Sequence, residues 1–475
     1  MPRVPWLLLL VAHAGYAAPP VTYQVRVDPE HERLDVSVCV PNAAATRRFF
    51  AGDERAVQLL GEPTRTSGGE VRREGEALVV SAWRAHECLR YTTELGAVAA
   101  EGRRALVRRV GPDFALDPGL VLWRPEYLQT ERDAELTFEL PEGWSVSAPW
   151  TPLDQAPHRR FRLGTSSPEY PAWIALGPFA EQLVDAGAGR YRLALLGTMD
   201  AAQRTKVAEH VRRSALEVSN VFPRVFALEP QVLVVPVGPS REASPFGMSN
   251  RGGAYAVSGL VDPQQPEASY RDSWTFVHEF THGVHPHLGG AGRWISEGIA
   301  TYYQNVLRAR SGRLTELEAW DELDAGFERG RKDRSELALA DLSARMGRLG
   351  HYMRGYWSGT ALVMMADVEL RTRKERPSSL DAALNAYLAC CRAREQEAEP
   401  DAFLATLDRE VGGEVFSTLY RRLATQSEFP DLGEAYRTLG LRHATPKVAL
   451  DQTDRDAVAL RRAIMGVSAE TNGGR

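Results

Sequence analysis

The chain has 475 residues, of which 44% are hydrophobic and 25% are charged. This length exceeds what one hydrophobic core usually serves, so two or three globular domains are expected and a peptide or a disordered tail is excluded. The 57 basic and 62 acidic side chains are mixed along the sequence and give a net charge of -5, so nucleic acid is not expected as a partner.

Residues 1–17 have the character of a targeting segment. Arg3 precedes an apolar run over residues 6–14, which is far too short to cross a bilayer. Gly15-Tyr16-Ala17 then supplies small residues at the two positions that a signal peptidase reads. We therefore expect a signal peptide and an exported protein, periplasmic or secreted. No later stretch reaches the ~20 apolar residues of a membrane helix, so no membrane span is expected.

Residues 18–196 alternate between apolar and polar side chains with a period of two, in short runs such as 22–27 and 135–140. Gly, Pro and Asp clusters separate these runs, as is typical of half-buried strands joined by turns. This region is predicted to be a β-rich N-terminal domain. Cys39 and Cys88 both lie in such runs, and the sequence is equally compatible with a bridge between them and with two free thiols.

From residue 197 onward the apolar period becomes that of helices. An amphipathic helix is predicted over 207–218, a buried strand over 231–237, and long helices from residue 273. Residues 197–399 are therefore expected to form the domain that carries the chemistry. Residues 400–475 are predicted to be a short helical C-terminal region, with helices over 403–407, 415–423 and 432–439.

Cys390 and Cys391 are neighbours inside a helical pattern. Because adjacent cysteines can be joined only with strain, two buried thiols are the prediction for this pair.

His278, Glu279 and His282 form the pattern His-Glu-x-x-His inside a predicted helix. Residues four apart lie one helical turn above each other, so the two imidazoles project from one face at the separation that a single zinc ion needs. Glu279 then lies beside the open side of the metal. The alternative is a half-buried helix with two structural histidines. Both interpretations predict that the helix packs on a core through one apolar stripe: Trp274, Val277, Phe280 and Val284.

The downstream residues favour the metal site. A glycine-rich loop is expected to end the first helix, and a second helix beginning at Trp294 can return antiparallel to it. Glu297 then lies opposite His278 and His282 and off the apolar stripe of its own helix. Two imidazoles and one carboxylate leave a fourth zinc position for water, whose pKa falls to about 7, with Glu279 as general base.

Three segments resemble the gluzincin metallopeptidases, and within them peptidase family M61, the glycyl-aminopeptidase-like branch. They are the His-Glu-x-x-His segment, Trp294-Ile295-Ser296-Glu297-Gly298, and Tyr356-Trp357-Ser358-Gly359 with residues 366–371. The resemblance implies an α+β protein, with a β-rich domain before a thermolysin-like, mainly helical zinc-peptidase domain. It also implies a peptide or protein substrate. This resemblance implies that Tyr356 donates a hydrogen bond to the oxyanion of the tetrahedral intermediate. Tyr352 is the competing candidate for this role. For either residue, the alternative is a tyrosine with a purely structural role.

The chain also departs from this family. Only 14 residues separate His282 from Glu297, fewer than in usual members. The family's substrate-edge strand carries a glutamate that binds the free amine of the peptide. The comparable segment here is either 247–250 or 252–256, and neither carries an acid. We take Gly252, Gly253 and Ala254 as the candidate substrate-binding residues, and the missing carboxylate leaves endopeptidase and aminopeptidase action both open.

Two further histidines lie close to the motif, and one alternative function remains open. His285 and His287 follow it closely and are expected at the rim or behind the ligands rather than in a second metal site. The alternative function is a non-catalytic binding or scaffold protein that retains a gluzincin fold. An intact Glu279 favours catalysis, because a structural zinc site needs no base.

Overall fold

The computed structural model describes residues 20–30, 32–41, 47–96, 107–126, 134–163, 173–227, 229–250, 255–391, 397–444 and 447–466. The predicted signal peptide lies outside these ranges, and so do Gly252, Gly253 and Ala254. The chain divides into two compact units. The first comprises residues 1–95 and 119–139, and the second comprises residues 96–118 and 140–475.

The first unit is built from strands, as the period-two pattern predicted. In β1 every second side chain is buried, and the residues between them face solvent. Five strands of this unit follow the order β11-β1-β2-β7-β4 in one sheet, and β10-β3-β6-β5 form another. Its elements are β1 (Val21–Asp28), β2 (Arg33–Val40), β3 (Arg48–Phe50), α1 (Ala56–Leu59), β4 (Thr64–Arg65), β5 (Val71–Glu74), β6 (Ala77–Val80), β7 (Glu87–Glu94), β10 (Arg124–Pro125) and β11 (Ala134–Glu139).

The second unit contains a five-stranded sheet of order β16-β17-β18-β20-β19, in which β19 is the edge strand. The parallel pairing of β17 with β18 and of β18 with β20 joins segments on both sides of residue 196. A four-stranded sheet, β12-β15-β9-β8, belongs to the same unit. The strands are β8 (Val107–Val110), β9 (Asp113–Leu116), β12 (Ser145–Ser147), β13 (Thr151–Pro152), β14 (Arg160–Leu163), β15 (Ile174–Gly177), β16 (Glu181–Asp185), β17 (Arg190–Leu195), β18 (Gln231–Pro236), β19 (Phe246–Asn250), β20 (Ala256–Val261), β21 (Leu441–Arg442) and β22 (Ala449–Leu450).

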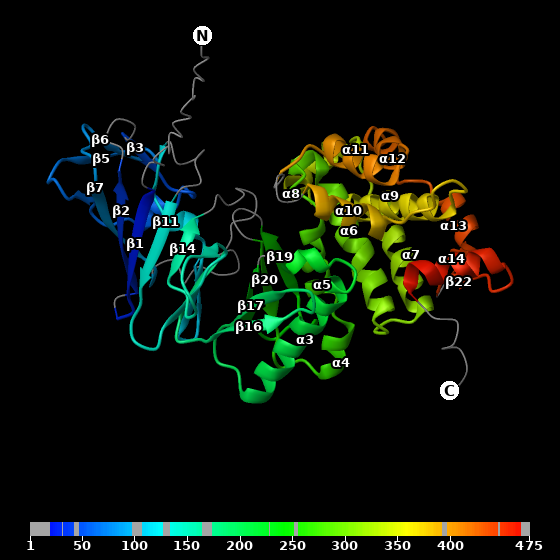
Figure 1. Ribbon diagram of the computed structural model, residues 1–475, viewed down its shortest axis with the longest axis horizontal. Coiled ribbons are helices and arrows are strands. Elements are labelled where there is room, and N and C mark those ends of the chain that lie inside the picture. The colour runs from blue at the N-terminus through cyan, green and yellow to red at the C-terminus, as the bar shows by residue number, and fades with distance from the viewer. Residues whose placement is uncertain are drawn as a thin grey trace, which may run out of the picture. The chain divides into compact units, whose positions relative to one another are not determined.

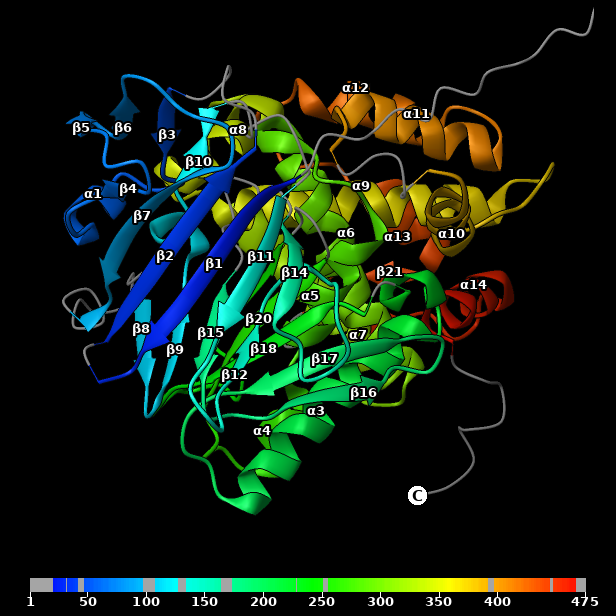
Figure 2. The same ribbon diagram turned by 60° about the vertical axis from the view of Figure 1, so that its left-hand side comes forward.

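Helices cover one face of the five-stranded sheet, where α3 and α5 lie beside its strands (Figures 1 and 2). The other face packs against the four-stranded sheet through a smaller apolar cluster that includes Val110, Ala175 and Leu233. The helices are α3 (Ala201–Ser219), α4 (Glu267–Asp272), α5 (Thr275–Thr281), α6 (Gly289–Arg310), α7 (Glu316–Lys332), α8 (Leu339–Leu349), α9 (Tyr352–Thr372), α10 (Leu380–Cys390), α11 (Pro400–Val411), α12 (Val415–Ala424), α13 (Gly433–Leu439) and α14 (Arg455–Met465).

This architecture confirms the predicted α+β class, with a β-rich N-terminal part followed by a mainly helical part. The amphipathic helix, the buried strand and the three C-terminal helices predicted from the sequence correspond to α3, β18, α11, α12 and α13. Helix α14 was not predicted. It is held to α6 by Arg310, whose Nε donates to the carbonyl of Ile464 at 2.8 Å.

The start of α6 corrects one prediction. We expected a glycine loop up to Trp294, but the helix begins at Gly289. A side chain at Gly292 would lie 2.6 Å from Leu288 and 2.8 Å from Pro400, so this glycine serves close packing inside the helix. Ser343 of α8 also stabilises this first turn, because its hydroxyl donates to the carbonyl of Gly290 at 2.7 Å.

Both cysteine pairs are disulfides. Cys39 and Cys88 face each other in the β2–β7 ladder with their Cα atoms 4.0 Å apart. The prediction of two buried thiols at Cys390 and Cys391 is wrong, because these residues are bridged and Cys390 is exposed. The pair lies at the end of α10, where Cys390 is the last helical residue and Cys391, the C-cap, has already left the helical conformation.

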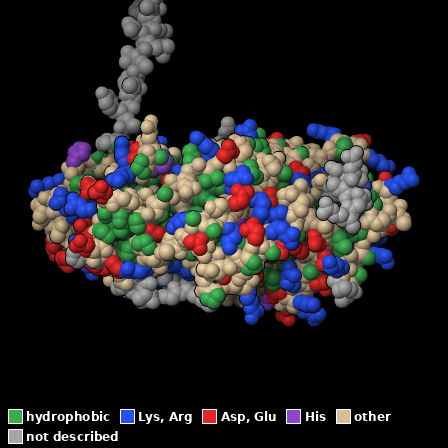
Figure 3. All heavy atoms as spheres, turned by 90° about the horizontal axis from the view of Figure 1, so that it is seen from below, with side chains coloured by type: hydrophobic (Ala, Val, Ile, Leu, Met, Phe, Trp, Pro, Cys, Tyr) green, Lys and Arg blue, Asp and Glu red, His purple; other side chains and the backbone are tan. Residues whose placement is uncertain are grey.

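Acidic and basic side chains are interspersed over the face seen in Figure 3, as their mixing along the sequence suggested. Among the described residues, no helix combines the length and the apolar character needed to cross a membrane.

Candidate metal centre

Helix α5 carries His278 and Glu279, and His282 caps its end. The helix is anchored by Phe276, Val277 and Phe280, which are fully buried in the core beneath the sheet. Trp274 departs from the predicted stripe: it is 37% exposed, and its ring forms a T-shaped pair with the His278 ring, with the centroids 5.5 Å apart.

Two long-range hydrogen bonds fix α5 against the sheet. The hydroxyl of Thr275 donates to the carbonyl of Ser244 at 2.6 Å. The hydroxyl of Tyr255 donates to the carbonyl of Glu279. The backbone that carries the metal-binding pattern is therefore tied to residues on either side of β19.

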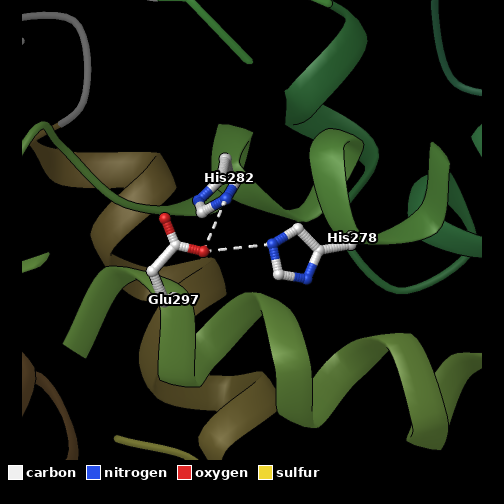
Figure 4. A group of neighbouring side chains, drawn as sticks. All are labelled: His278, His282 and Glu297. Carbon is white, nitrogen blue, oxygen red and sulfur yellow. Dashed lines mark hydrogen bonds and ion pairs between the residues drawn. The ribbon is translucent and has the colours of Figure 1, made fainter. Parts of the chain in front are cut away.

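The structure brings the three predicted ligands together (Figure 4). His278 Nε2 lies 3.2 Å from Glu297 Oε2, and His282 Nε2 lies 3.6 Å from the same oxygen. One ligand atom from each residue lies within 4.8 Å of the other two, and all three side chains are buried. This set of two imidazoles and one carboxylate is the kind of donor set that zinc takes in catalytic sites.

The second nitrogen of each imidazole has a partner that directs the first toward the shared centre. His278 Nδ1 lies 2.8 Å from the side-chain oxygen of Gln304, to which an Nδ1 proton can be donated, while Nε2 faces Glu297 and the shared centre. His285 Nδ1 donates to the carbonyl of Pro286 at 2.8 Å, which leaves His285 Nε2 to accept from His282 Nδ1 at 3.2 Å. Both ligand nitrogens are thereby prepared for a cation, and the residues fit a zinc ion.

The charges of the three residues support the same conclusion. Burial alone raises the pKa of Glu297, but the charges and hydrogen bonds of His282 and His278 outweigh burial and hold that pKa well below its usual value. Burial alone lowers the pKa of His278, but Glu297 and Glu279 outweigh it and raise that pKa. The carboxylates thus favour positive charge at the point where the ligand atoms converge.

A cavity of about 140 Å³ opens onto the three ligands. Glu279 lies on it, close to the edge strand β19. A Cβ atom at Gly247 would lie 2.5 Å from Glu279 Cγ and 2.9 Å from its Oε1, so only glycine fits opposite this carboxylate. Of the two segments that we considered for the substrate edge, 247–250 contributes to the cavity wall. The lining residues are Phe246, Gly247, Met248, Ser249, His278, Glu279, His282, His287, Leu288, Gly289, Arg293, Ser296, Glu297 and Tyr356.

Tyr356 and Tyr352 occupy different surroundings. Tyr356 lines the cavity, and its ring is stacked at 6.4 Å from the ring of His278. Tyr352 is 41% exposed and is not part of the cavity wall. Its hydroxyl lies 3.5 Å from the carbonyl of Gly347. The geometry therefore favours Tyr356 as the tyrosine that can reach a molecule in the cavity.

Sequence reasoning missed some supporting residues. Gln304 lies seven residues after Glu297, two turns along α6 and on the same face, and this spacing could have indicated it. Ser296 lies 3.4 Å from His282 Nδ1. His285 contacts His282, and His287 lines the cavity, so both occupy the positions behind the ligands and at the rim that we expected.

No protein-family model matches the chain, and no curated protein sequence matches it. Solved structures with a similar fold do exist. An aminopeptidase N family protein from Idiomarina loihiensis is 14% identical, with a TM-score of 0.68 over 89% of this chain and 78% of that one. An M1 zinc metallopeptidase from Deinococcus radiodurans is 15% identical, with a TM-score of 0.50 over 87% of this chain and 95% of that one.

A variant of the Deinococcus radiodurans enzyme bound to the substrate Tyr-Ser-Ala is also similar, at 14% identity and a TM-score of 0.51, over 87% of this chain and 95% of that one. At these identities the likeness concerns the fold. The chain therefore has the fold of the M1 zinc metallopeptidases, in agreement with the gluzincin resemblance of its motifs.

Proposed function

We propose that this protein hydrolyses peptide bonds with a zinc ion held by His278, His282 and Glu297. The observation that carries the proposal is the convergence of these three buried ligand atoms within 4.8 Å, on a cavity that also contains Glu279. When bound, zinc supplies a water of lowered pKa and polarises the carbonyl oxygen of the substrate.

In this mechanism the residues of the chain transfer protons, stabilise the developing charge and orient the metal ligands. Glu279 takes the proton of the attacking water and delivers it to the leaving nitrogen, acting as general base and then as general acid. Tyr356 donates a hydrogen bond to the oxygen that gains charge in the transition state. Gln304 and His285 keep the imidazoles in the tautomer that presents Nε2 to the ion.

The cavity also argues against the alternative function, a non-catalytic protein that retains a gluzincin fold. A structural zinc site usually closes its fourth position with a protein ligand, whereas here the three ligands border an open cavity that includes Glu279. Catalysis is therefore the better-supported function.

Two narrower proposals rest on the sequence. Membership of the glycyl-aminopeptidase-like branch is supported by the segment 356–359, whose tyrosine lines the cavity. Export to the periplasm or the medium is supported by the charged, apolar and small-residue pattern of residues 1–17.

The test of the function is Glu279→Gln. This variant should keep zinc but lose at least ~10²-fold in kcat on a peptide that the wild type cleaves, because it removes the base without removing a ligand. Metal analysis and turnover are measured on the same preparation. Wild-type turnover in the variant would contradict the assigned role of Glu279, and a wild type that binds no zinc and cleaves no peptide from a broad library would contradict the function.

A further inference from the structure

The distribution of charge in the metal-site cavity indicates which peptides it accepts. Among the described residues that line it, the only carboxylates are Glu279 and Glu297. The proposed function, on which this inference rests, uses Glu297 as a ligand and Glu279 as the base. The remaining charged side chain of the wall, Arg293, is a cation. Among the described lining residues, no further acid is therefore left for a positively charged group of the substrate.

The wall formed by β19 carries no charged side chain, and one of its residues, Ser249, lies where a charged side chain would face the cavity. Side chains alternate along a strand, so residues 247 and 249 share a face. Gly247 points toward Glu279 and Thr275 of α5, since a Cβ there would lie within 2.7 Å of both side chains. Ser249 therefore faces the same side, about 7 Å further along the strand, and it lines the cavity with a hydroxyl group.

A peptide can present either an ammonium or an amide at this wall. An amide N–H needs one acceptor, which a serine hydroxyl can provide. An ammonium that is removed from water without a counter-charge is far more costly.

We propose that the site takes peptides whose residue on the amino side of the scissile bond is acylated, as in an internal or N-blocked peptide, and that it discriminates against a free α-amine. Ser249 is then the specificity-determining residue. A carboxylate at this position would supply the missing counter-charge and reverse the preference.

Binding to the zinc-loaded Glu279→Gln variant tests the proposal without turnover. Two peptides of the same sequence, one N-acetylated and one with a free amine, are titrated by calorimetry at a pH where the amine is charged. The acetylated peptide should bind at least ~10-fold more tightly. Equal binding, tighter binding of the free amine, or no detectable binding of the acetylated peptide overturns the proposal.

A second comparison tests the residue itself in the Glu279→Gln background. Ser249→Glu should shift the affinity ratio toward the free amine by at least ~10-fold, whereas Ser249→Gln, of the same length but neutral, should not. An equal shift in both variants, or none in Ser249→Glu, removes Ser249 from the role. Because these readouts are affinities, they are independent of the turnover loss that tests the proposed function.

Discussion

At the scale of single residues, each imidazole of the proposed zinc site has a partner outside the His-Glu-x-x-His pattern. The pattern itself fixes which side chains share a face, because the helical turn is a local property. Gln304 and His285 then determine which ring nitrogen is available, and they reach the ligands from α6 and from the turn after α5. The histidine ligands were therefore predictable from spacing, and His285 was expected behind them, whereas Gln304 was missed although its spacing from Glu297 could have indicated it.

Replacing His282 by Ala should abolish stable zinc binding, because one of three protein ligands is lost. Zinc per chain is measured by mass spectrometry after extensive dialysis. His285→Ala is the matched control: it removes only the partner of His282 Nδ1, so it should retain zinc at saturation with an affinity lower by roughly 10-fold to 100-fold. Full zinc occupancy in His282→Ala would place the ion elsewhere.

Tyr356→Phe should lower kcat and kcat/KM together by roughly 10²-fold while zinc content and KM change little. The hydroxyl is expected to act on charge that develops only in the transition state, and the ring still packs. Tyr352→Phe is the control and should keep wild-type kinetics, since Tyr352 lies outside the cavity wall. Loss of folding stability without a kcat defect in Tyr356→Phe would assign that tyrosine a structural role.

At the scale of elements, the site depends on the contact between α6 and α9. A Cβ at Gly359 would lie 1.7 Å from the carbonyl oxygen of Trp294, and one at Gly298 would lie 2.2 Å from the carbonyl carbon of Gly359. The two helices therefore touch through their backbones. Glu297 is adjacent to one glycine and Tyr356 is one turn before the other, so this contact brings a ligand and the cavity tyrosine to the same place.

Gly359→Ala should destabilise the protein by at least about 1–3 kcal/mol, because an added methyl group forces the helices apart. It should also weaken zinc binding, since Glu297 lies beside the contact. The control is Gly347→Ala in α8, where the added atom comes no closer than 3.6 Å to Arg293. That variant should instead gain about 0.5–1 kcal/mol from helix propensity. Thermal and denaturant unfolding of both variants measures the difference, and equal stability would refute the close contact.

At the scale of the whole molecule, we expect a buried histidine of α3 to link the stability of the fold to pH. His210 of α3 is 1% exposed and packs against the rings of Tyr270 and Phe276. Burial, followed by the charges of Arg313 and Arg213, lowers its pKa from 6.5 to about 3. The imidazole is therefore neutral in the fold over a pH range in which it is protonated in the unfolded chain.

The free energy of unfolding should consequently fall as the pH decreases from about 6.5 toward 3, because the unfolded chain binds one more proton than the fold in this window. Above pH 6.5 this group contributes no pH dependence. His210→Phe keeps an aromatic ring but cannot titrate, so its unfolding free energy should fall less over the same window. Denaturant unfolding at several pH values compares the two proteins, and parallel pH profiles would show that His210 contributes nothing.

The sequence by itself determined what depends on local geometry. Period-two burial in β1 and the helical spacing of His278 and His282 follow from repeats of a few residues, and the structure agrees with both. Glu297 was chosen because a second helix could return antiparallel and because its side chain lies off the apolar stripe of that helix; in the structure it lies beside both histidines. The expected glycine loop before Trp294 failed, because α6 already begins at Gly289, whose φ is +62°, and Gly292 lies inside the helix in close contact with Leu288 and the distant Pro400.

Only the tertiary structure decided the pairings between distant segments. The parallel alignment of β17 with β18, the backbone contact at Gly298 and Gly359, and the approach of β19 to Glu279 each join residues separated by more than thirty positions. Such contacts depend on how whole elements pack. A glycine that opens a turn cannot be distinguished by sequence alone from a glycine that allows two helices to touch. For that reason the ligands could be derived from spacing, but the wall of the cavity and the tyrosine that reaches it could not.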